Sequence, residues 1–205
     1  MSIVTVFGGN AVETGDAGYQ EAYELGRLLA QAGFTVATGG YYGTMEATSR
    51  GAKEAGGRVI GVTTARFDDR LGPNQWVDEE VKFPTLFQRL HYLVTFSDAL
   101  VALRGGVGTL SEVALAWSLI QVGEMSRKPL VLVGPHWRNI METFHRESTV
   151  KERDWALLSF AASVADVIPL LSSQAAGDTP QDAGCKTQFT QRGIRGTHYI
   201  RGEPL

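Results

Sequence analysis

The sequence predicts an α/β protein in three layers, with a Rossmann-like, doubly wound and mostly parallel sheet between helices. Apolar, β-branched runs of strand length recur along the chain, and helical patterns separate them. This alternation is typical of parallel sheets with crossover helices. Two glycine-rich turns also follow such runs directly, as turns at the strand ends of these folds do. The predicted strands are Ile3–Phe7, Phe34–Ala37, Val59–Val62, Ala99–Leu103, Leu130–Val133 and Leu157–Phe160.

The predicted helices follow from apolar residues at helical spacing and from signals at the ends. Gly33 ends the first helix as a residue just past a helix often does, and Pro84 suits the first turn of the third. The stretch Arg66–Lys82 has no clear period and is predicted to be a loop, which in compact domains is often functional. The predicted helices cover residues 17–32, 44–55, 84–97, 109–122, 137–146 and 163–171, and the fourth is expected to bury Leu110, Val113, Ala114, Trp117 and Ile120.

The length and composition indicate one domain followed by a tail. The chain has 205 residues, 43% of them hydrophobic, and domains average about 150 residues. We expect the domain to cover residues 1–171. Ser172–Gly184 is rich in Ser, Ala, Gly, Asp and Pro and predicts a linker, while Cys185–Leu205 has no clear period. A mobile tail and a partner-binding arm are the two alternatives for this end.

Charge and residue usage exclude several classes of protein. The net charge of −3 argues against a nucleic-acid-binding surface, which is usually basic. Cys185 is the single cysteine, so no intrachain disulfide forms and a reducing compartment is the simpler assumption. The start has no basic leader, and no run of about 18 apolar residues occurs. We therefore expect a cytoplasmic protein that contacts neither nucleic acid nor membrane.

The segment Leu103–Glu112 follows an apolar run and opens an amphipathic one, which predicts a strand, a glycine turn and a helix start. The first N–H groups of a helix have no intrahelical partner, and the helix dipole adds partial positive charge there. Such a turn is suited to hold a phosphate group. The carboxylate of Glu112 close by indicates chemistry as well as binding.

A second segment, Gly39–Ala47, repeats this pattern after its own strand. The carboxyl ends of parallel strands share one edge of the sheet, so both turns would face one crevice, together with Gly8–Asn10. The alternative is that these glycines only permit tight turns and close packing of helices. Glu46 either contacts ribose hydroxyls or caps its helix. The predicted phosphate or nucleotide contacts are Gly8, Gly9, Gly39, Gly40, Gly43, Thr44, Arg104, Gly105, Gly106, Val107, Gly108 and Thr109.

Other ligand-binding motifs do not fit this sequence. A dinucleotide-binding fingerprint needs a third glycine, but Ser111 follows Gly108 at that spacing. A P-loop needs glycine, lysine and a hydroxyl residue in succession, and no such run occurs. The lysines lie outside both glycine turns, which argues against a pyridoxal-phosphate enzyme. The four histidines have no metal-ligand spacing. We expect neither a cofactor nor a metal ion.

On these residues, over about positions 3–171, the chain resembles the LOG family of cytokinin-activating phosphoribohydrolases. The family has an essential arginine nine residues before the aspartate of a Ser/Ala-Asp-Ala strand start, and Arg89 stands nine residues before Asp98. Its signature, Pro-Gly-Gly-x-Gly-Thr-x-x-Glu, has Arg104 here in place of the proline. The other matches are Gly39, Gly40, Gly43, Met45 and Ala47 in the first turn, Gly56–Val62 after it, and Gly105, Gly106, Gly108, Thr109 and Glu112 in the second.

The resemblance implies an enzyme that hydrolyses the N-glycosidic bond of a nucleoside 5′-monophosphate, AMP or an N6-modified AMP. The products are the free base and ribose 5-phosphate, and no cofactor takes part. Glu112 would stabilise the oxocarbenium-like transition state or activate water. Arg89 would hold the phosphate or a ribose hydroxyl, or polarise the departing base. The alternatives are a glutamate favoured by the helix dipole and a solvated arginine.

Two other functions stay open at this stage. Related proteins of this fold carry the molybdenum cofactor, so the chain is alternatively a non-catalytic binding protein for a phosphorylated ligand of nucleotide or pterin type. A third alternative is a nucleotide sensor that acts through a partner. The family resemblance also implies a homodimer or higher homo-oligomer, and Trp117, Leu119 and Ile120 are candidate interface residues.

Overall fold

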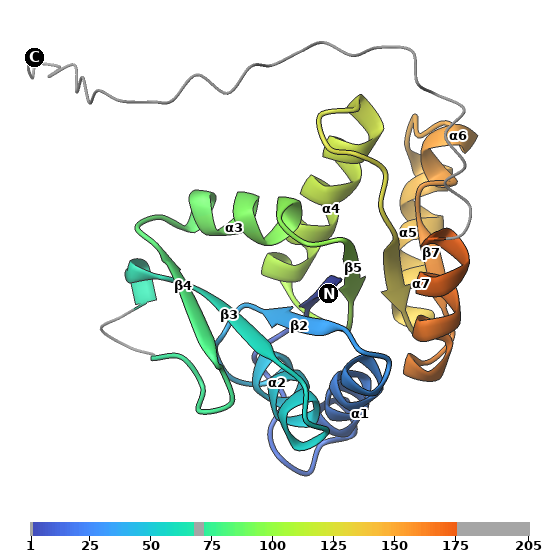
Figure 1. Ribbon diagram of the computed structural model, residues 1–205. Helices are drawn as coiled ribbons and strands as arrows, with labels where there is room; N and C mark the ends of the chain where they lie inside the picture. The colour runs from blue at the N-terminus through green and yellow to red at the C-terminus, as the bar shows by residue number, and fades with distance from the viewer. Residues whose placement is uncertain (1, 68–71, 176–205) are drawn as a thin grey trace, which may run out of the picture.

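The computed structural model describes residues 2–67 and 72–175, which form one fully parallel, seven-stranded sheet (Figure 1). The strand order is β4-β3-β2-β1-β5-β6-β7, so the chain starts in the middle of the sheet and adds strands first on one side and then on the other. The predicted doubly wound fold is confirmed. The strands are β1 Ile3–Phe7, β2 Thr35–Thr38, β3 Val59–Thr64, β4 Glu79–Phe83, β5 Ala99–Ala102, β6 Leu130–Val133 and β7 Ser159–Ala161.

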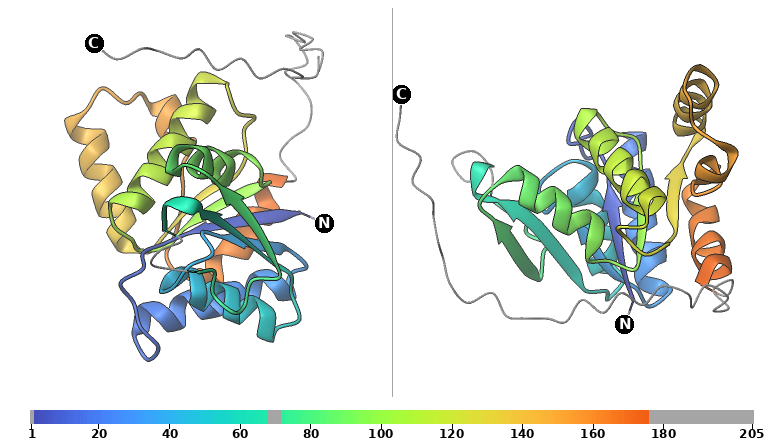
Figure 2. Two further views of the ribbon diagram at one scale, coloured as in Figure 1. Left: turned by 90° about the vertical axis from the view of Figure 1, so that its left-hand side faces the viewer. Right: turned by 90° about the horizontal axis from the view of Figure 1, so that it is seen from above.

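Helices cover both faces of the sheet and complete the three predicted layers, as the left view of Figure 2 shows. Helices α1, α2 and α7 pack on one face, and α3, α4 and α5 pack on the other. None of the helices in the described ranges is long and apolar enough to cross a membrane. The helices are α1 Ala17–Gln31, α2 Thr44–Glu54, α3 Leu86–Thr95, α4 Val107–Val122, α5 Pro135–Glu147, α6 Glu152–Trp155 and α7 Val167–Ala175, with short 3₁₀ turns at Ala65–Phe67 and Val164–Asp166.

The core consists of two apolar clusters, one on each face of the sheet. Because successive side chains of a strand point to opposite faces, Val4 and Val6 of β1 join one cluster and Phe7 joins the other. Helices α1 and α2 pack together through glycines: a Cβ on Gly26 would lie 2.0 Å from the Thr48 carbonyl oxygen, and one on Gly51 would lie 1.9 Å from the Tyr23 carbonyl oxygen. Helix α2, which follows the β2 turn, is therefore held close against α1.

The prediction of a loop over Arg66–Lys82 is wrong in part, because the segment contains the end of a 3₁₀ turn and most of β4. Strand β4 lies at the edge of the sheet and exposes charged side chains, so it lacks the apolar run of a central strand. Its partner in register is β3, and the pair brings Phe83 opposite Thr64. The next helix, α3, begins at Leu86 rather than Pro84, since the Thr85 hydroxyl accepts a hydrogen bond from the Gln88 N–H and caps it.

Helix α4 differs from its predicted burial pattern. Leu110 and Ala114 are exposed, whereas Val113, Trp117 and Ile120 are buried as expected. The candidate interface residues Trp117, Leu119 and Ile120 are buried and belong to the apolar cluster on one face of the sheet. Helical spacing marks an apolar stripe but does not say which part of a wide stripe meets the sheet.

The last helix, α7, continues to Ala175, past the predicted domain end at residue 171 and into the predicted linker Ser172–Gly184. Serines at 172 and 173 donate hydrogen bonds to the carbonyl groups of the preceding turn, which helices tolerate near their ends. The remainder of that linker and the predicted tail Cys185–Leu205 lie outside the described residues.

Candidate functional site

The turns after β1, β2 and β5 meet at the carboxyl edge of the sheet. The Gly9 N–H donates a hydrogen bond of 3.2 Å to the Arg104 carbonyl, and the Thr44 N–H donates one of 2.9 Å to the Gly9 carbonyl. The β1 turn therefore links the two glycine-rich turns. The expectation that segments 8–10, 39–47 and 103–112 lie together at one edge is confirmed.

Glycines are required where these turns touch. A Cβ on Gly8 would lie 2.2 Å from Thr44 Cγ2, and one on Gly105 would lie 2.1 Å from Thr109 Oγ1. Gly43 has φ +69°, a conformation that favours glycine, and a Cβ there would lie 2.6 Å from the Asn10 Cα. The close approach of the three turns depends on the absence of these side chains.

The β5 turn is open to solvent. Residues 104–108 are all exposed, and a Cβ on Gly106 or Gly108 would meet nothing within 4 Å among the described residues. Helix α4 begins at Val107, so its first N–H groups point out at this turn without intrahelical acceptors. Thr109 is buried beneath the turn, against Gly105. The arrangement suits an anion bound by main-chain N–H groups.

The β2 turn is closed. Gly39, Gly40 and Tyr41 are buried, and the Asn74 side-chain amide donates hydrogen bonds to the carbonyl groups of Gly40 (3.1 Å) and Tyr41 (2.7 Å). The Thr44 N–H, at the start of α2, is already donated to Gly9. The two turns that look alike in the sequence therefore differ in how many donors they offer to a ligand.

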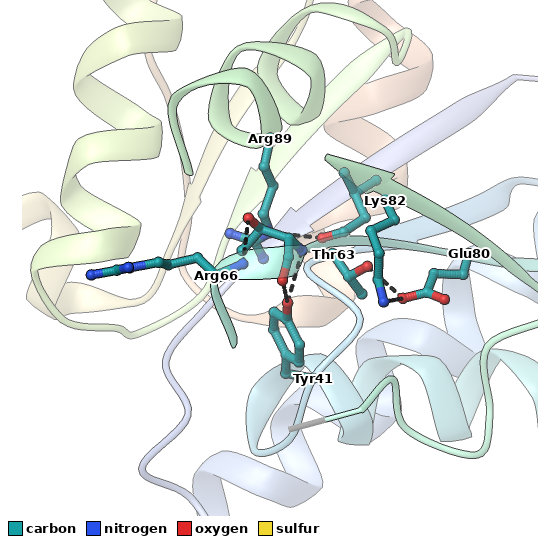
Figure 3. Close-up of polar contacts among 8 residues, drawn as sticks. Tyr41, Thr63, Arg66, Glu80, Lys82 and Arg89 are labelled. Atoms are coloured by element: carbon teal, nitrogen blue, oxygen red, sulfur yellow. Dashed lines mark hydrogen bonds and ion pairs between the residues drawn. The ribbon is translucent and has the colours of Figure 1, made fainter. Parts of the chain in front are cut away.

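Arg89 is buried at 7% exposure and contacts the main chain at two strand ends. Its Nε donates a hydrogen bond of 2.7 Å to the Val62 carbonyl, and its Nη2 donates one of 3.0 Å to the Gly39 carbonyl. The guanidinium lies over the Tyr41 ring at 5.5 Å. Figure 3 shows Arg89 and Tyr41 approaching the end of β3 from opposite sides, while Arg66 extends away from them.

Glu112 lies in the second turn of α4, beside the open turn, and is partly buried. Burial raises the pKa of this carboxyl to about 7, although the positive charge of Arg89 opposes the rise. Burial also lowers the pKa of the Arg89 guanidinium, which the negative charge of Glu112 opposes. A carboxyl with a pKa near neutrality is suited to give and take a proton at physiological pH.

Glu46 lies apart from the Arg89–Glu112 pair. It lines an open hollow of about 470 Å³ between the β1–α1 loop and the start of α2, and neither Arg89 nor Glu112 lines that hollow. The other lining residues are Asn10, Val12, Glu13, Thr14, Tyr19, Tyr42 and Gly43. Among the described residues, no group of three or more His, Cys, Asp or Glu side chains could hold a metal ion.

Three residues that support the site were absent from the sequence prediction: Tyr41, Thr64 and Asn74. The Tyr41 hydroxyl donates to the Thr64 carbonyl (3.2 Å) and accepts from the Thr64 N–H (2.8 Å). A large aromatic residue inside a glycine-rich turn was the available signal for Tyr41. Asn74 had none, because its partners lie more than 30 positions earlier in the chain.

An apolar groove of about 530 Å³ runs between α4 and α5, on the face of the sheet that carries Arg89 and Glu112. Trp117 and Phe144 meet edge to face across it at 6.2 Å. Leu110, Ile140 and Phe144 line it and are each about half exposed, at 45%, 51% and 51%. Exposed apolar groups in one groove are typical of an interaction surface.

A profile of the SLOG cluster4 family matches residues 1–158. The cytokinin riboside 5′-monophosphate phosphoribohydrolase of Mycobacterium tuberculosis is 32% identical over 142 residues, which cover 64% of this chain and 75% of that relative. The predicted resemblance to phosphoribohydrolases of the LOG type is therefore confirmed as a relationship of sequence.

Solved structures with the same fold include two proteins named for the molybdenum cofactor. The molybdenum cofactor binding protein of Rippkaea orientalis superposes with a TM-score of 0.69 at 28% identity, covering 85% of this chain and 97% of that one. The molybdenum cofactor carrier protein of Chlamydomonas reinhardtii superposes with a TM-score of 0.68 at 30% identity, covering 85% and 98%. Proteins named for catalysis and proteins named for carriage are thus both similar to this chain.

Proposed function

This chain belongs to the SLOG cluster4 family, and we propose that it hydrolyses the N-glycosidic bond of a nucleoside 5′-monophosphate. AMP or an N6-modified AMP is the substrate, and the products are the free base and ribose 5-phosphate. The observation that carries this proposal is the position of Glu112, a carboxyl with a pKa of about 7 one turn beyond an open helix start whose N–H groups are suited to a phosphate. A phosphate on that turn brings the attached ribose close to this carboxyl.

The reaction makes two demands that these residues can meet. The N-glycosidic bond breaks with its electron pair on the base, which takes up a proton from solvent, and the Glu112 carboxylate stabilises the positive charge left on the ribose. The attacking water bonds to the anomeric carbon and gives up a proton, which the same carboxylate accepts. The N–H groups at the start of α4 hold the 5′-phosphate. Arg89 keeps part of the Glu112 population ionised near pH 7, because its charge opposes the effect of burial.

A panel of nucleoside 5′-monophosphates, including AMP and N6-isopentenyl AMP, tests the proposal by the base that each releases. We expect release that falls about 100- to 1000-fold in Glu112→Gln, because the general base is lost. Glu142→Gln is the matched control, since Glu142 lies exposed on α5 and forms a surface ion pair with Arg138. Release at the wild-type rate in Glu112→Gln, or no release from any nucleotide, contradicts the proposal.

A carrier for a phosphorylated pterin is the second candidate. Two Arg89 nitrogens donate hydrogen bonds to the carbonyl groups of Gly39 and Val62. This favours a carrier, because an arginine held in this way has fewer N–H donors left for a substrate. The two structural neighbours named for the molybdenum cofactor support the same function. Tight binding of the cofactor without turnover of any nucleotide, equal in wild type and Glu112→Gln, would favour the carrier.

We also propose that the groove between α4 and α5 pairs with its copy on a second chain, giving a homodimer. Leu110, Ile140 and Phe144 supply the exposed apolar surface, and the same patch on two copies forms a self-complementary interface. Sedimentation should show a dimer that Phe144→Glu dissociates. Val122→Glu is the control, since Val122 is 65% exposed but lies outside the groove. A wild-type monomer at micromolar concentration contradicts this proposal.

A further inference from the structure

Strand β3 extends beyond its neighbour β2 at the edge that carries the site. The last pair in register is Thr38 with Gly61, so Val62, Thr63 and Thr64 continue without a partner on β2. The Arg58 carbonyl accepts a hydrogen bond from the Val36 N–H, so the carbonyl groups of residues 58, 60, 62 and 64 point toward β2. Val62 and Thr64 therefore present main-chain groups that no strand satisfies on that side.

Two side chains occupy this gap. Arg89 Nε donates to the Val62 carbonyl at 2.7 Å, and the Tyr41 hydroxyl exchanges two hydrogen bonds with the main chain of Thr64, at 2.8 and 3.2 Å. Figure 3 shows both side chains at the end of β3. Because unpaired buried main-chain groups are costly, this arrangement fixes where Arg89 and Tyr41 can lie.

Tyr41 also contacts Arg89 directly. Its ring lies 5.5 Å from the Arg89 guanidinium carbon, a cation–π distance, and the edge of the Phe67 ring packs on it at 5.6 Å and 72°. Tyr41 is 4% exposed. A Cβ on Gly39 would lie 2.1 Å from Arg89 Nη2, so this glycine leaves the space that the guanidinium fills. The guanidinium is therefore held by carbonyls at two nitrogens and by an aromatic ring on one side.

We propose that Tyr41 is a positioning residue that holds the Arg89 guanidinium in place and acts through Arg89 on the reactivity of Glu112. The inference rests on the proposed function in one respect, that Glu112 is the reacting carboxyl. The contacts of the Tyr41 side chain are with Thr64, Phe67 and Arg89. It acts through Arg89, with the hydroxyl anchored on β3 and the ring against the guanidinium.

The direction of the expected effect follows from the charges at this place. Among the described residues, the charged group that acts on Glu112 is Arg89 from α3, and the groups that act on Arg89 are Glu112 from α4 and Tyr41 from the β2 turn. Burial raises the Glu112 pKa, and Arg89 lowers it. Loosening Arg89 therefore raises the Glu112 pKa above its value of about 7.

Titration of the Glu112 carboxyl by ¹³C NMR tests the inference without any need for turnover. The protein is labelled with ¹³C-glutamate, and the Glu112 signal is the one missing in Glu112→Gln. Tyr41→Phe keeps the ring and loses the two hydrogen bonds to Thr64, whereas Tyr41→Leu also loses the ring. Tyr23→Phe is the matched control, because it removes a hydroxyl of α1 that donates to Glu54 of α2, on the face of the sheet away from α3.

We expect the Glu112 pKa to rise by about one unit in Tyr41→Leu and by less in Tyr41→Phe, and to stay unchanged in Tyr23→Phe. A group with a pKa near 7 that rises by about one unit is about five times less ionised at pH 7, so turnover there should fall about fivefold and recover at higher pH. An unchanged Glu112 pKa in a folded Tyr41→Phe, with only a lower melting temperature, overturns the inference.

The two proposals fail in different ways. If no nucleotide is hydrolysed and the Glu112 pKa still rises in the Tyr41 variants, the proposed function falls and Tyr41 keeps its positioning role. If nucleotides are hydrolysed and the limb of the pH–rate profile stays in place in Tyr41→Phe, the positioning role falls and the function stands. Should Tyr41→Leu fail to fold, Tyr41→Phe decides between these outcomes.

Discussion

The two glycine-rich turns of this protein differ in structure although their sequences look alike. The turn after β2 is closed: its carbonyl groups at Gly39, Gly40 and Tyr41 accept hydrogen bonds from Arg89 and Asn74. The turn after β5 is open, with residues 104–108 exposed and free space around Gly106. One turn therefore supports the site, and the other is available to a ligand.

The difference shows that glycine spacing does not distinguish a binding turn from a supporting turn. Gly43 has a positive φ and lies close against Asn10. Gly106, at the equivalent helix start, has φ −99°, and a Cβ there would meet no described atom within 4 Å. The first needs glycine for its own conformation, whereas the second leaves its main chain open to solvent, and we propose that a ligand binds there. Substitutions at these two positions should separate stability from binding.

Gly43→Ala is predicted to have the largest effect on stability. The new Cβ would lie 2.6 Å from the Asn10 Cα at a φ of +69°, so strain and a main-chain clash combine. We expect a loss of about 3 kcal/mol in the free energy of unfolding, measured by urea denaturation.

Gly106→Ala is the matched comparison in the open turn. No described atom lies within 4 Å of its Cβ position, so we expect a stability within about 0.5 kcal/mol of wild type and an affinity for ribose 5-phosphate about tenfold lower. Equal stability losses in the two alanine variants would abolish the distinction between a supporting turn and a binding turn.

Sequence reasoning predicted the parallel sheet and the meeting of three turns, because both follow from local periodicity and from the shared edge of parallel strands. It did not predict that Arg89 is buried at 7% exposure, because an arginine is ordinarily solvated at the surface. The burial of Arg89 depends on two carbonyls, Gly39 and Val62, that lie 50 and 27 positions away. Such contacts have no periodic signal.

The same limit applies to β4 and to Asn74. Strand β4 forms because β3 offers an edge, and its exposed charged residues give no run of apolar residues to detect. Asn74 is recognisable only once the β2 turn has folded against it. Elements built from local signals were therefore predictable, whereas residues that close the β2 turn were not.

A pH dependence of stability should reveal the buried carboxyl beside the open turn. The Glu112 pKa is about 7 in the folded protein and lies at the ordinary value of 4.5 in the unfolded chain, so the folded state binds the extra proton between these values. Glu112 then contributes a loss of stability that grows as pH rises from about 4.5 to about 7 and stays constant above that.

The difference between wild type and Glu112→Gln isolates this contribution, because other carboxyls titrate equally in both. Urea denaturation between pH 5 and pH 8 should show Glu112→Gln gaining about 1–2 kcal/mol relative to wild type over that interval, a value reduced for partial solvent exposure. If the difference in free energy of unfolding between the two proteins does not change with pH, Glu112 is as well solvated as a surface glutamate. The open turn then has no buried carboxyl beside it.

Arg104→Ala is predicted to have the smallest effect and to act on binding alone. Arg104 is exposed at the open turn, and its carbonyl, which the substitution keeps, accepts the hydrogen bond from Gly9. We expect an affinity for ribose 5-phosphate about threefold lower at low salt, with less difference at high salt because an exposed charge is screened. Arg127→Ala, which removes the same charge from the exposed segment before β6 at the opposite edge of the sheet, should leave the affinity unchanged. Equal losses in both variants would mean that the affinity depends on the net charge of the protein and not on the position of Arg104. The open turn would then bind phosphate through its main chain without help from this side chain.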